Sequence, residues 1–164
     1  MIQATNGNFY GTSVYGGAAG PCYISCGTIF SITSGGTLTT VHSFDKTDGE
    51  NPSGGLFQAT NGTFYGTTFQ GGANGAGTIF SLSLGLGPFV KTLPTSGAVG
   101  VAVIILGTDL TGATSVTFDG TAAKFTVASS SEITTTVPAG ATSGKVKVVT
   151  PNGTLSSNVS FRVP

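Results

Sequence analysis

Short runs of apolar and β-branched residues alternate with turn-forming residues along the whole chain. From Lys145 to Val148 the alternation is strict, which predicts a strand that points Val146 and Val148 inward and both lysines toward water. No window of about eleven residues or more shows the apolar period of a helix. The pattern therefore predicts an all-β protein with almost no helix.

The first half of the chain contains a repeated segment. The sequence QATNGTFYGTTFQGG at residues 58–72 repeats QATNGNFYGTSVYGG at residues 3–17, with 11 of 15 positions identical. Further on, GTIFS at residues 77–81 repeats residues 27–31, and five extra residues after Gly17 explain why the spacing changes from 55 to 50. A self-match at a fixed period predicts a repeated supersecondary unit.

Each repeat is expected to contain four short strands. The Asn-Gly pairs at residues 6–7 and 61–62 predict type I′ hairpin turns, in which both central residues have positive φ. A period of about 50 residues with four strands is typical of a propeller blade, so a partial propeller-like β-repeat region is expected. The strands are predicted at residues 8–13, 27–33, 37–44 and 56–60, and the second repeat resumes at 63–68 and 77–83.

About one and a half repeats are present, whereas a repeat array usually needs about three to complete its core. Open strand edges are therefore expected at residues 3–5 and 77–83. An exposed flat edge invites association, so we expect these edges to pair with another copy of the chain, as a homo-oligomer, or with the second half of the chain.

The residue pattern of the sequence changes at Pro88. Prolines and glycines there mark a linker, and strand-like runs follow at regular spacing. Such spacing over about 80 residues is typical of an immunoglobulin-like β-sandwich. The chain is thus expected to contain two modules, residues 1–86 and residues 87–164. The sandwich strands are predicted at residues 101–107, 115–118, 124–128, 133–137, 145–149 and 155–163.

The repeat resembles a known bacterial family. Its YGT and GG elements at residues 10–12 and 16–17, with Phe44, Asp48-Gly49 and Pro52, are similar to the GloVer tandem repeat over about residues 1–85. That resemblance implies a secreted or surface β-repeat protein without a defined activity.

The second module resembles an IPT/TIG domain over about residues 88–163. The resemblance is carried by residues 105–108, 116–120, 137–138 and 144–148, which read ILGT, VTFDG, VP and GKVKV. Transcription-factor members of that family bind DNA through basic loops, which this sequence lacks. The resemblance to bacterial surface members implies a spacer or a binding platform.

Charge and hydropathy exclude two classes of partner. Only 7% of residues are charged and the formal net charge is zero, so neither half offers the basic face that nucleic acid requires. No apolar run approaches the length of a membrane span. Met1 is followed directly by repeat sequence without a signal peptide, and we expect a fragment of an extracellular or cell-surface protein.

Cys22 and Cys26 lie four positions apart within the five-residue insertion and its flanks. A disulfide between them would stiffen the added loop and indicate an oxidising compartment, whereas two reduced thiols are the alternative. With one histidine in the chain, a zinc site is not expected.

The acidic segment from Asp45 to Asn51 holds three of the six acidic residues. Asp45, Asp48 and Glu50 offer oxygen ligands around a glycine, as Ca²⁺ prefers, and a turn closed by Pro52 is the alternative. His42 lies just before them in a predicted strand, where Leu38, His42 and Phe44 are expected to share one face. The simplest interpretation of His42 is an imidazole bonded to a backbone group, and the alternative is a catalytic role.

Recurrent aromatic pairs suggest a ligand platform. Phe9-Tyr10 recurs as Phe64-Tyr65, and adjacent strand residues face opposite ways, so one ring of each pair is expected inside and the other on the surface. Exposed tyrosines would stack on sugars, whereas core packing is the simpler account. Tyr10 and Tyr65, extended by Tyr15 and Tyr23 near the insertion, are the candidate ligand-binding residues.

Two candidate functions follow. The first is a non-enzymatic extracellular module for adhesion, glycan binding or spacing, with a polysaccharide or small molecule as ligand and no cofactor. The second is a small secreted hydrolase of lactones, esters or glycosides that depends on bound Ca²⁺, with His42, Asp45, Asp48 and Glu50 as its residues.

Overall fold

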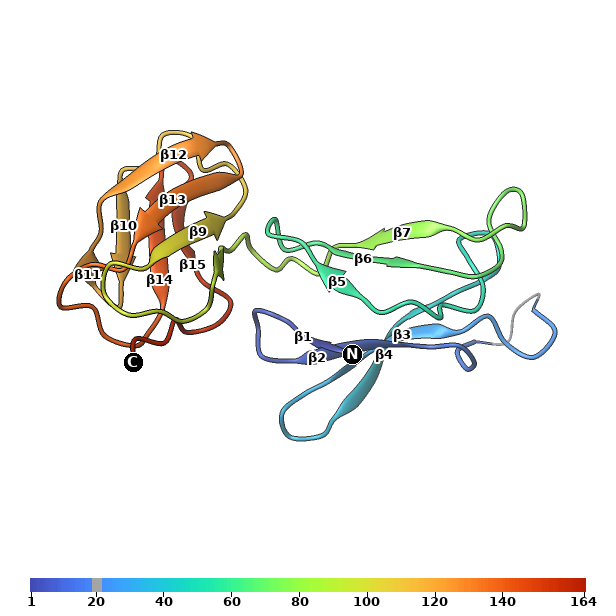
Figure 1. The fold of residues 1–164 in the computed structure, drawn as a ribbon. Helices are drawn as coiled ribbons and strands as arrows, with labels where there is room; N and C mark the ends of the chain where they lie inside the picture. Colours follow the sequence, from blue (N-terminus) through green and yellow to red (C-terminus); the bar gives the residue numbers. More distant parts are fainter. Residues whose placement is uncertain (19–21) are drawn as a thin grey trace. The chain divides into compact units, whose positions relative to one another are not determined.

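The computed structural model describes residues 1–18 and 22–164, and within them it contains only strands, turns and loops (Figure 1). The strands form four antiparallel sheets, which confirms the all-β prediction. The chain divides into two compact units, Met1–Leu86 and Gly87–Pro164, which we call the repeat region and the sandwich. None of the described residues belongs to a helix long and apolar enough to cross a membrane.

The repeat region contains two sheets built from the same motif. The first sheet consists of β1 (Ile2–Gln3), β2 (Phe9–Ser13), β3 (Thr28–Ile32) and β4 (Leu38–Ser43), hydrogen-bonded in that order. The second sheet consists of β5 (Phe57–Gln58), β6 (Phe64–Thr67) and β7 (Ile79–Leu82), again in order. The second sheet stops at three strands because the chain next enters the sandwich. Within the described residues, the two sheets do not close into a propeller or barrel.

The registers of the two sheets correspond residue by residue. Ile2 pairs with Tyr10 in the first sheet, as Phe57 pairs with Tyr65 in the second. The glycine of each YGT element faces a phenylalanine on the next strand: a Cβ on Gly11 would lie 2.7 Å from the ring of Phe30, and Gly66 faces Phe80 still more closely. The glycine therefore leaves room for a ring to lie across the strand.

The prediction of type I′ turns is wrong. Gly7 has a φ of 83°, but Asn6 does not have positive φ. The Gly7 N–H donates to Ala4 O and the Ala4 N–H donates to Asn8 O, each at 2.9 Å, so the loop has three residues and the glycine closes it. Asn6 instead accepts a bond from the Asn8 N–H through its side-chain oxygen (3.1 Å). Residues 59–63 repeat this arrangement.

A β-bulge in β4 decides which side chains share a face. Ile29 pairs with His42 but Phe30 pairs with Thr40, so Val41 is an extra residue in the ladder. The extra residue inverts the alternation between Leu38 and His42 and places their side chains on opposite faces of the sheet. The prediction that Leu38 shares a face with His42 and Phe44 is therefore wrong.

The two sheets of the repeat region pack face to face. The rings of Tyr10 and Phe64 lie 4.7 Å apart between centroids, and Phe44 contacts Phe80 edge-on at 5.2 Å. Gln58 reaches from the second sheet to accept a bond from the Thr5 N–H (3.2 Å). The core is completed by buried apolar residues from both sheets and their loops: Ala4, Cys22, Cys26, Ile29 and Leu56.

The sandwich consists of two four-stranded sheets around a separate core. One sheet has the order β11-β10-β14-β15 and the other β12-β13-β9-β8. The strands are β8 (Lys91–Leu93), β9 (Ala102–Leu106), β10 (Ser115–Phe118), β11 (Thr121–Ala122), β12 (Phe125–Ser129), β13 (Glu132–Thr136), β14 (Val146–Thr150) and β15 (Gly153–Ser156). Val146 and Val148 are fully buried, as the alternating pattern predicts.

The prediction of one strand over residues 155–163 is wrong. Strand β15 ends at Ser156, and Ser157 then donates its hydroxyl to Val159 O (2.6 Å) while accepting the Val146 N–H (3.1 Å). The side chain thus replaces one acceptor of the strand ladder, while the Ser157 N–H still donates to Val146 O (2.8 Å), and the chain turns after this pair. Phe161 returns to the core and forms an isolated bridge with Gly144.

Candidate functional site

Three loops meet at one end of the repeat region, which we call the loop end. They connect β2 to β3 (residues 14–27), β4 to β5 (44–56) and β6 to β7 (68–78). Backbone bonds tie them together: the Asn51 N–H donates to Cys26 O (2.9 Å) and the Phe69 N–H donates to Asn51 O (3.0 Å). The loop end is thus a hydrogen-bonded surface rather than three independent loops.

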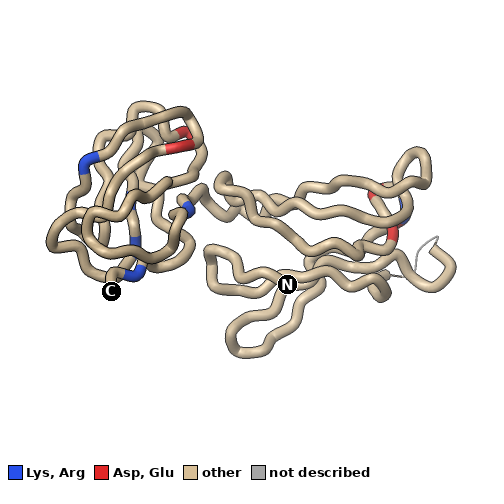
Figure 2. The backbone as a smooth tube through the Cα atoms, viewed as in Figure 1, with Lys and Arg blue, Asp and Glu red and all other residues tan. Residues whose placement is uncertain are grey.

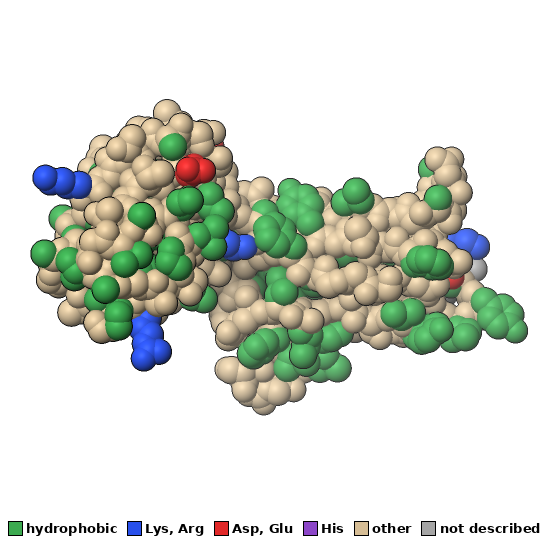
Figure 3. Space-filling model, viewed as in Figure 1, with side chains coloured by type: hydrophobic (Ala, Val, Ile, Leu, Met, Phe, Trp, Pro, Cys, Tyr) green, Lys and Arg blue, Asp and Glu red, His purple; other side chains and the backbone are tan. Residues whose placement is uncertain are grey.

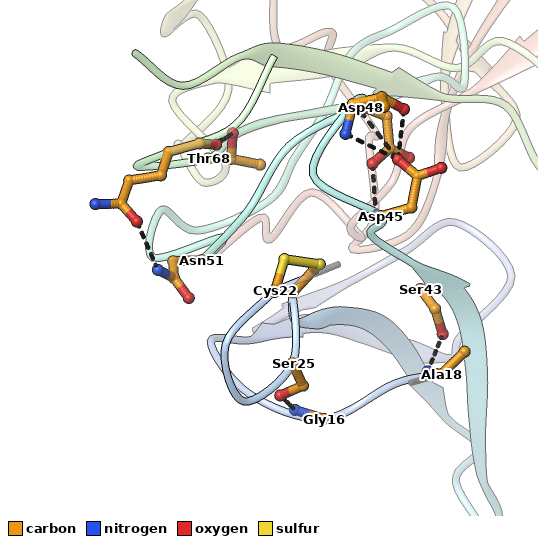
Figure 4. Close-up of a disulfide and its surroundings, with 12 residues drawn as sticks. Gly16, Ala18, Cys22, Ser25, Ser43, Asp45, Asp48, Asn51 and Thr68 are labelled. Carbon is orange, nitrogen blue, oxygen red and sulfur yellow. Dashed lines mark hydrogen bonds between the residues drawn. A yellow bond between two sulfur atoms is a disulfide. The ribbon is translucent and has the colours of Figure 1, made fainter. Parts of the chain in front are cut away.

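A disulfide joins Cys22 and Cys26 in the first of these loops (Figure 4). The two Cα atoms are 5.3 Å apart, and both cysteines are buried. Ser25, between them, accepts a bond from the Gly16 N–H (2.7 Å), which anchors the loop to the end of β2. Residues 19–21 of the insertion lie outside the described residues.

The acidic segment forms a tight turn. Oδ1 of Asp45 accepts bonds from the N–H and hydroxyl of Thr47 and from the Asp48 N–H, while the Asp45 N–H donates to Asp48 Oδ1 (3.0 Å). The hydroxyl of Thr47 is the main reason that the pKa of Asp45 lies below its ordinary value, with the Asp48 N–H second. Glu50 pairs through its backbone with Gln70.

His42 contacts a carboxylate rather than the backbone group expected from the sequence. Its Nε2 lies 2.6 Å from Asp48 Oδ2, and its ring meets Phe44 edge-on at 4.9 Å. The pair lines a cavity of about 140 Å³ whose other walls are mostly apolar, with Ile29, Phe44 and Phe80 beside Ser81 and Leu82. A carboxylate that orients an imidazole at the mouth of an apolar cavity is an arrangement that general-base catalysis uses.

The predicted calcium ligands Asp45, Asp48 and Glu50 all lie in the loop after β4, and Ca²⁺ binding by them stays a prediction. No group of three His, Cys, Asp or Glu side chains that could hold a metal ion occurs in the described parts of the chain. Two oxygens that Ca²⁺ would need, on Asp45 and Asp48, already accept bonds within the turn. The donor set therefore fits a structural turn better than a hard cation, which requires six or more oxygens.

The tyrosines predicted to form a ligand platform do not share one environment. Tyr10 is only 4% exposed, because its ring packs on Phe64 and its hydroxyl accepts a bond from the Asn6 side chain (3.0 Å). Tyr10 is therefore a core residue, in agreement with core packing as the simpler account of its ring. Tyr65 lies on the exposed face of the second sheet, while Tyr15 and Tyr23 are exposed at the loop end.

Models of known families match the chain in two overlapping segments. Residues 1–115, more than half of the chain, match the Gloeobacter/Verrucomicrobia repeat. The chain belongs to this repeat family. Residues 88–163 match the IPT/TIG domain, so the sandwich is an IPT/TIG domain and both resemblances seen in the sequence are confirmed. A comparison with curated proteins found no match. A Gloeobacter/Verrucomicrobia repeat followed by an IPT/TIG domain fits a structural or binding module.

The loop end of the Gloeobacter/Verrucomicrobia repeat carries one exposed aromatic residue that the sequence analysis missed. Phe69 is 69% exposed and follows β6 where Val14 follows β2 in the first copy. The sequence did contain a signal for this residue, because an aromatic side chain replaces an aliphatic one at the same loop position of the repeat. The loop end also carries all four charged residues of the repeat region, which lie within residues 45–50 and are coloured on the backbone in Figure 2.

Proposed function

We propose that this chain is a non-enzymatic extracellular binding module, in which the loop end holds a glycan by stacking sugar rings on aromatic side chains. The observation that carries the proposal is the exposure of Tyr15, Tyr23 and Phe69 on loops that are tied to one another by backbone bonds and a disulfide. Large exposed rings on an ordered surface offer contact area with little loss of conformational freedom. The sandwich then acts as a spacer or platform.

The disulfide supports the extracellular part of the proposal, because such bonds persist in oxidising compartments. Protein isolated without reductant should contain no free thiol that reacts with a thiol reagent in denaturant, and should contain two after reduction. Protein isolated from its native host with both thiols reduced would contradict an extracellular location.

Affinity electrophoresis through gels containing neutral polysaccharides tests the binding role. The full chain should be retarded by at least one polysaccharide, and Tyr23→Ala and Phe69→Ala should each weaken retention by about tenfold or more, as expected for the loss of a stacking ring. Val99→Ala removes an exposed apolar side chain of the sandwich and is the matched control, which should bind like the parent chain. Equal retention of all variants would remove the loop end from the binding site.

The cavity beside His42 and Asp48 favours one alternative, a small secreted hydrolase of lactones, esters or glycosides. In that function Asp48 orients His42, which acts as the base toward an attacking water. Turnover of a chromogenic panel should then disappear in Asp48→Asn and His42→Gln. The sequence-based expectation of Ca²⁺ dependence is tested by the same assay with chelator and with Ca²⁺ restored. Panel-wide inactivity of the parent chain would exclude the alternative for those substrates.

A further inference from the structure

Each sheet of the repeat region has two different apolar faces. We call one the Tyr face, which in the first sheet carries Ile2, Tyr10, Ile29 and Ser31. The other is the Phe face, which in the second sheet carries Gln58, Phe64, Phe80 and Leu82. Residues directly opposite each other on paired strands share a face, so these sets follow from the register.

The contact inside the repeat region joins the Tyr face of the first sheet to the Phe face of the second. Tyr10 stacks on Phe64, and Phe64 is completely buried. Gln58 is also buried and bonds to residue Thr5 of the first sheet's hairpin. The two sheets therefore pack with the Tyr face of one against the Phe face of the next, as successive blades of a propeller do. They do not pack through identical surfaces.

This packing leaves one face of each kind uncovered. The Tyr face of the second sheet is exposed at Tyr65 and Ile79, with Ile79 83% exposed. The Phe face of the first sheet is exposed at Phe9 and Leu38, with Leu38 65% exposed, and Phe30 and Ile32 are partly exposed. Hydrophobic side chains are correspondingly visible over the surface of the repeat region in Figure 3.

The uncovered faces carry nearly the same residues as the buried ones. On the Tyr face, Tyr65, Ile79 and Ser81 correspond to Tyr10, Ile29 and Ser31. On the Phe face, Gln3, Phe9 and Phe30 correspond to Gln58, Phe64 and Phe80. Gln3 also keeps the local bond of Gln58, to the carbonyl of the hairpin glycine. A surface that fits each uncovered face is thus present on every copy of the chain.

We propose that copies of this chain associate head to tail, with the uncovered Phe face of one copy packing on the uncovered Tyr face of the next. The contact repeats the one between the two sheets of a single chain. Neither face carries a charged side chain, since the charges of the repeat region lie within residues 45–50, so no repulsion keeps the faces apart.

Such a contact uses different surfaces on the two partners, so it continues until a ring closes or a filament forms. Propellers contain about four to eight blades, so a closed ring would hold about that number of sheets. The second sheet has three strands and no counterpart of β4. The contact between chains therefore has no equivalent of the edge-on contact between the Phe44 and Phe80 rings, and it is weaker than the contact within one chain.

Light scattering coupled to size-exclusion chromatography of the full chain, over a range of concentrations, measures the association. The parent chain should exceed the 16.2 kDa mass of one copy at high concentration. Ile79→Lys blocks the Tyr face and Leu38→Lys blocks the Phe face, and each variant alone should be monomeric. Val99→Lys, on the sandwich, is the charge-matched control and should associate like the parent chain. All three positions are exposed, so circular dichroism should confirm that the variants fold.

Mixing the two blocked variants distinguishes a head-to-tail contact from a symmetric one. Each variant retains the face that the other has lost, so an equimolar mixture should form a dimer of one copy of each and grow no further. Both substitutions introduce the same charge, so attraction between them does not explain the restored contact. The proposal is overturned if the parent chain stays monomeric throughout, if either blocked variant associates normally, or if the mixture remains monomeric.

Discussion

At the scale of single residues, two buried threonines of the sandwich illustrate how hydrogen bonding decides whether a buried polar side chain stabilises or destabilises the fold. Thr135 donates its hydroxyl to Lys124 O (2.7 Å), whereas Oγ1 of Thr92 is buried and, among the described residues, has no partner. A buried hydroxyl without a partner loses its hydrogen bonds to water on folding and forms no hydrogen bond within the protein to replace them. The two positions should therefore respond in opposite ways to the same substitution.

Thr92→Val should stabilise the sandwich by about 1 kcal/mol, because valine keeps the shape of threonine and removes the unpaired hydroxyl. Thr135→Val is the matched comparison and should destabilise by about 1 kcal/mol, because it removes a hydrogen bond and leaves a carbonyl without its donor. Urea unfolding of the three proteins measures both changes. A lower midpoint for Thr92→Val than for the parent would show that the hydroxyl has a partner in solution.

Asp45 provides a pH-dependent test of the acidic turn. Its pKa is lowered in the folded state, so its contribution to stability is present above the ordinary carboxyl pKa and is lost as the pH falls through the lowered value. Thr47→Val removes the hydroxyl that contributes most and should raise the pKa of Asp45 toward its ordinary value. An NMR titration of the Asp45 carboxyl measures this, with Thr39→Val as a control on β4. An unchanged pKa would assign the shift to the backbone donors instead.

At the scale of elements, the glycine of the YGT motif is needed for space rather than for backbone freedom. Gly66 faces the ring of Phe80 across β6 and β7, and Gly11 faces Phe30 in the first sheet. Glycine in a strand usually weakens it, but a ring that lies over the glycine covers the exposed backbone. The glycine of the motif thus allows a phenylalanine ring to pack on this face of the sheet.

Gly66→Ala should destabilise the repeat region by about 1–3 kcal/mol, since the added methyl group displaces Phe80 from its partly buried position against the core. Gly55→Ala is the matched control, because a Cβ there meets nothing within 4 Å, and it should change stability by no more than about 0.5 kcal/mol. Thermal unfolding followed by near-ultraviolet circular dichroism reports both. Equal midpoints for the two variants would mean that the ring adjusts at no cost.

At the scale of the whole molecule, two cores are built from different residues. The core of the repeat region centres on Tyr10, Phe44 and Phe64. That of the sandwich centres on Phe118, Phe161 and the buried valines of β10 and β14, which are Val116, Val146 and Val148. Each core is enclosed by its own pair of sheets. Unfolding of one unit therefore does not require exposure of the other core.

Calorimetry of the full chain should show two unfolding transitions. Thr92→Val should raise only the unfolding temperature of the sandwich, and Gly66→Ala should lower only that of the repeat region. Each substitution acts within one core. One cooperative transition that moves with both substitutions would contradict independent units.

Much of the fold could be predicted because its signals are local. The alternation at Val146 and Val148, the hairpin glycines and the repeat itself each concern neighbouring residues or an identical segment. The turn type at Asn6 and the end of β15 could not be predicted, since a side-chain hydrogen bond competes there with the backbone pattern. For the candidate site, the sequence indicated His42 and Asp48 separately, but their contact depends on how the loop after β4 folds back.

The sequence by itself determined that this protein is made of strands, that one unit is repeated, and that a second module follows, because strand period and glycine turns are properties of a short stretch of backbone. Only the tertiary structure decided which ring of each Phe-Tyr pair is buried. The two sheets offer the same pair to both faces, and Tyr10 is covered in one sheet while Phe64 is covered in the other. The choice depends on which side a neighbouring sheet occupies, and no local pattern specifies that side.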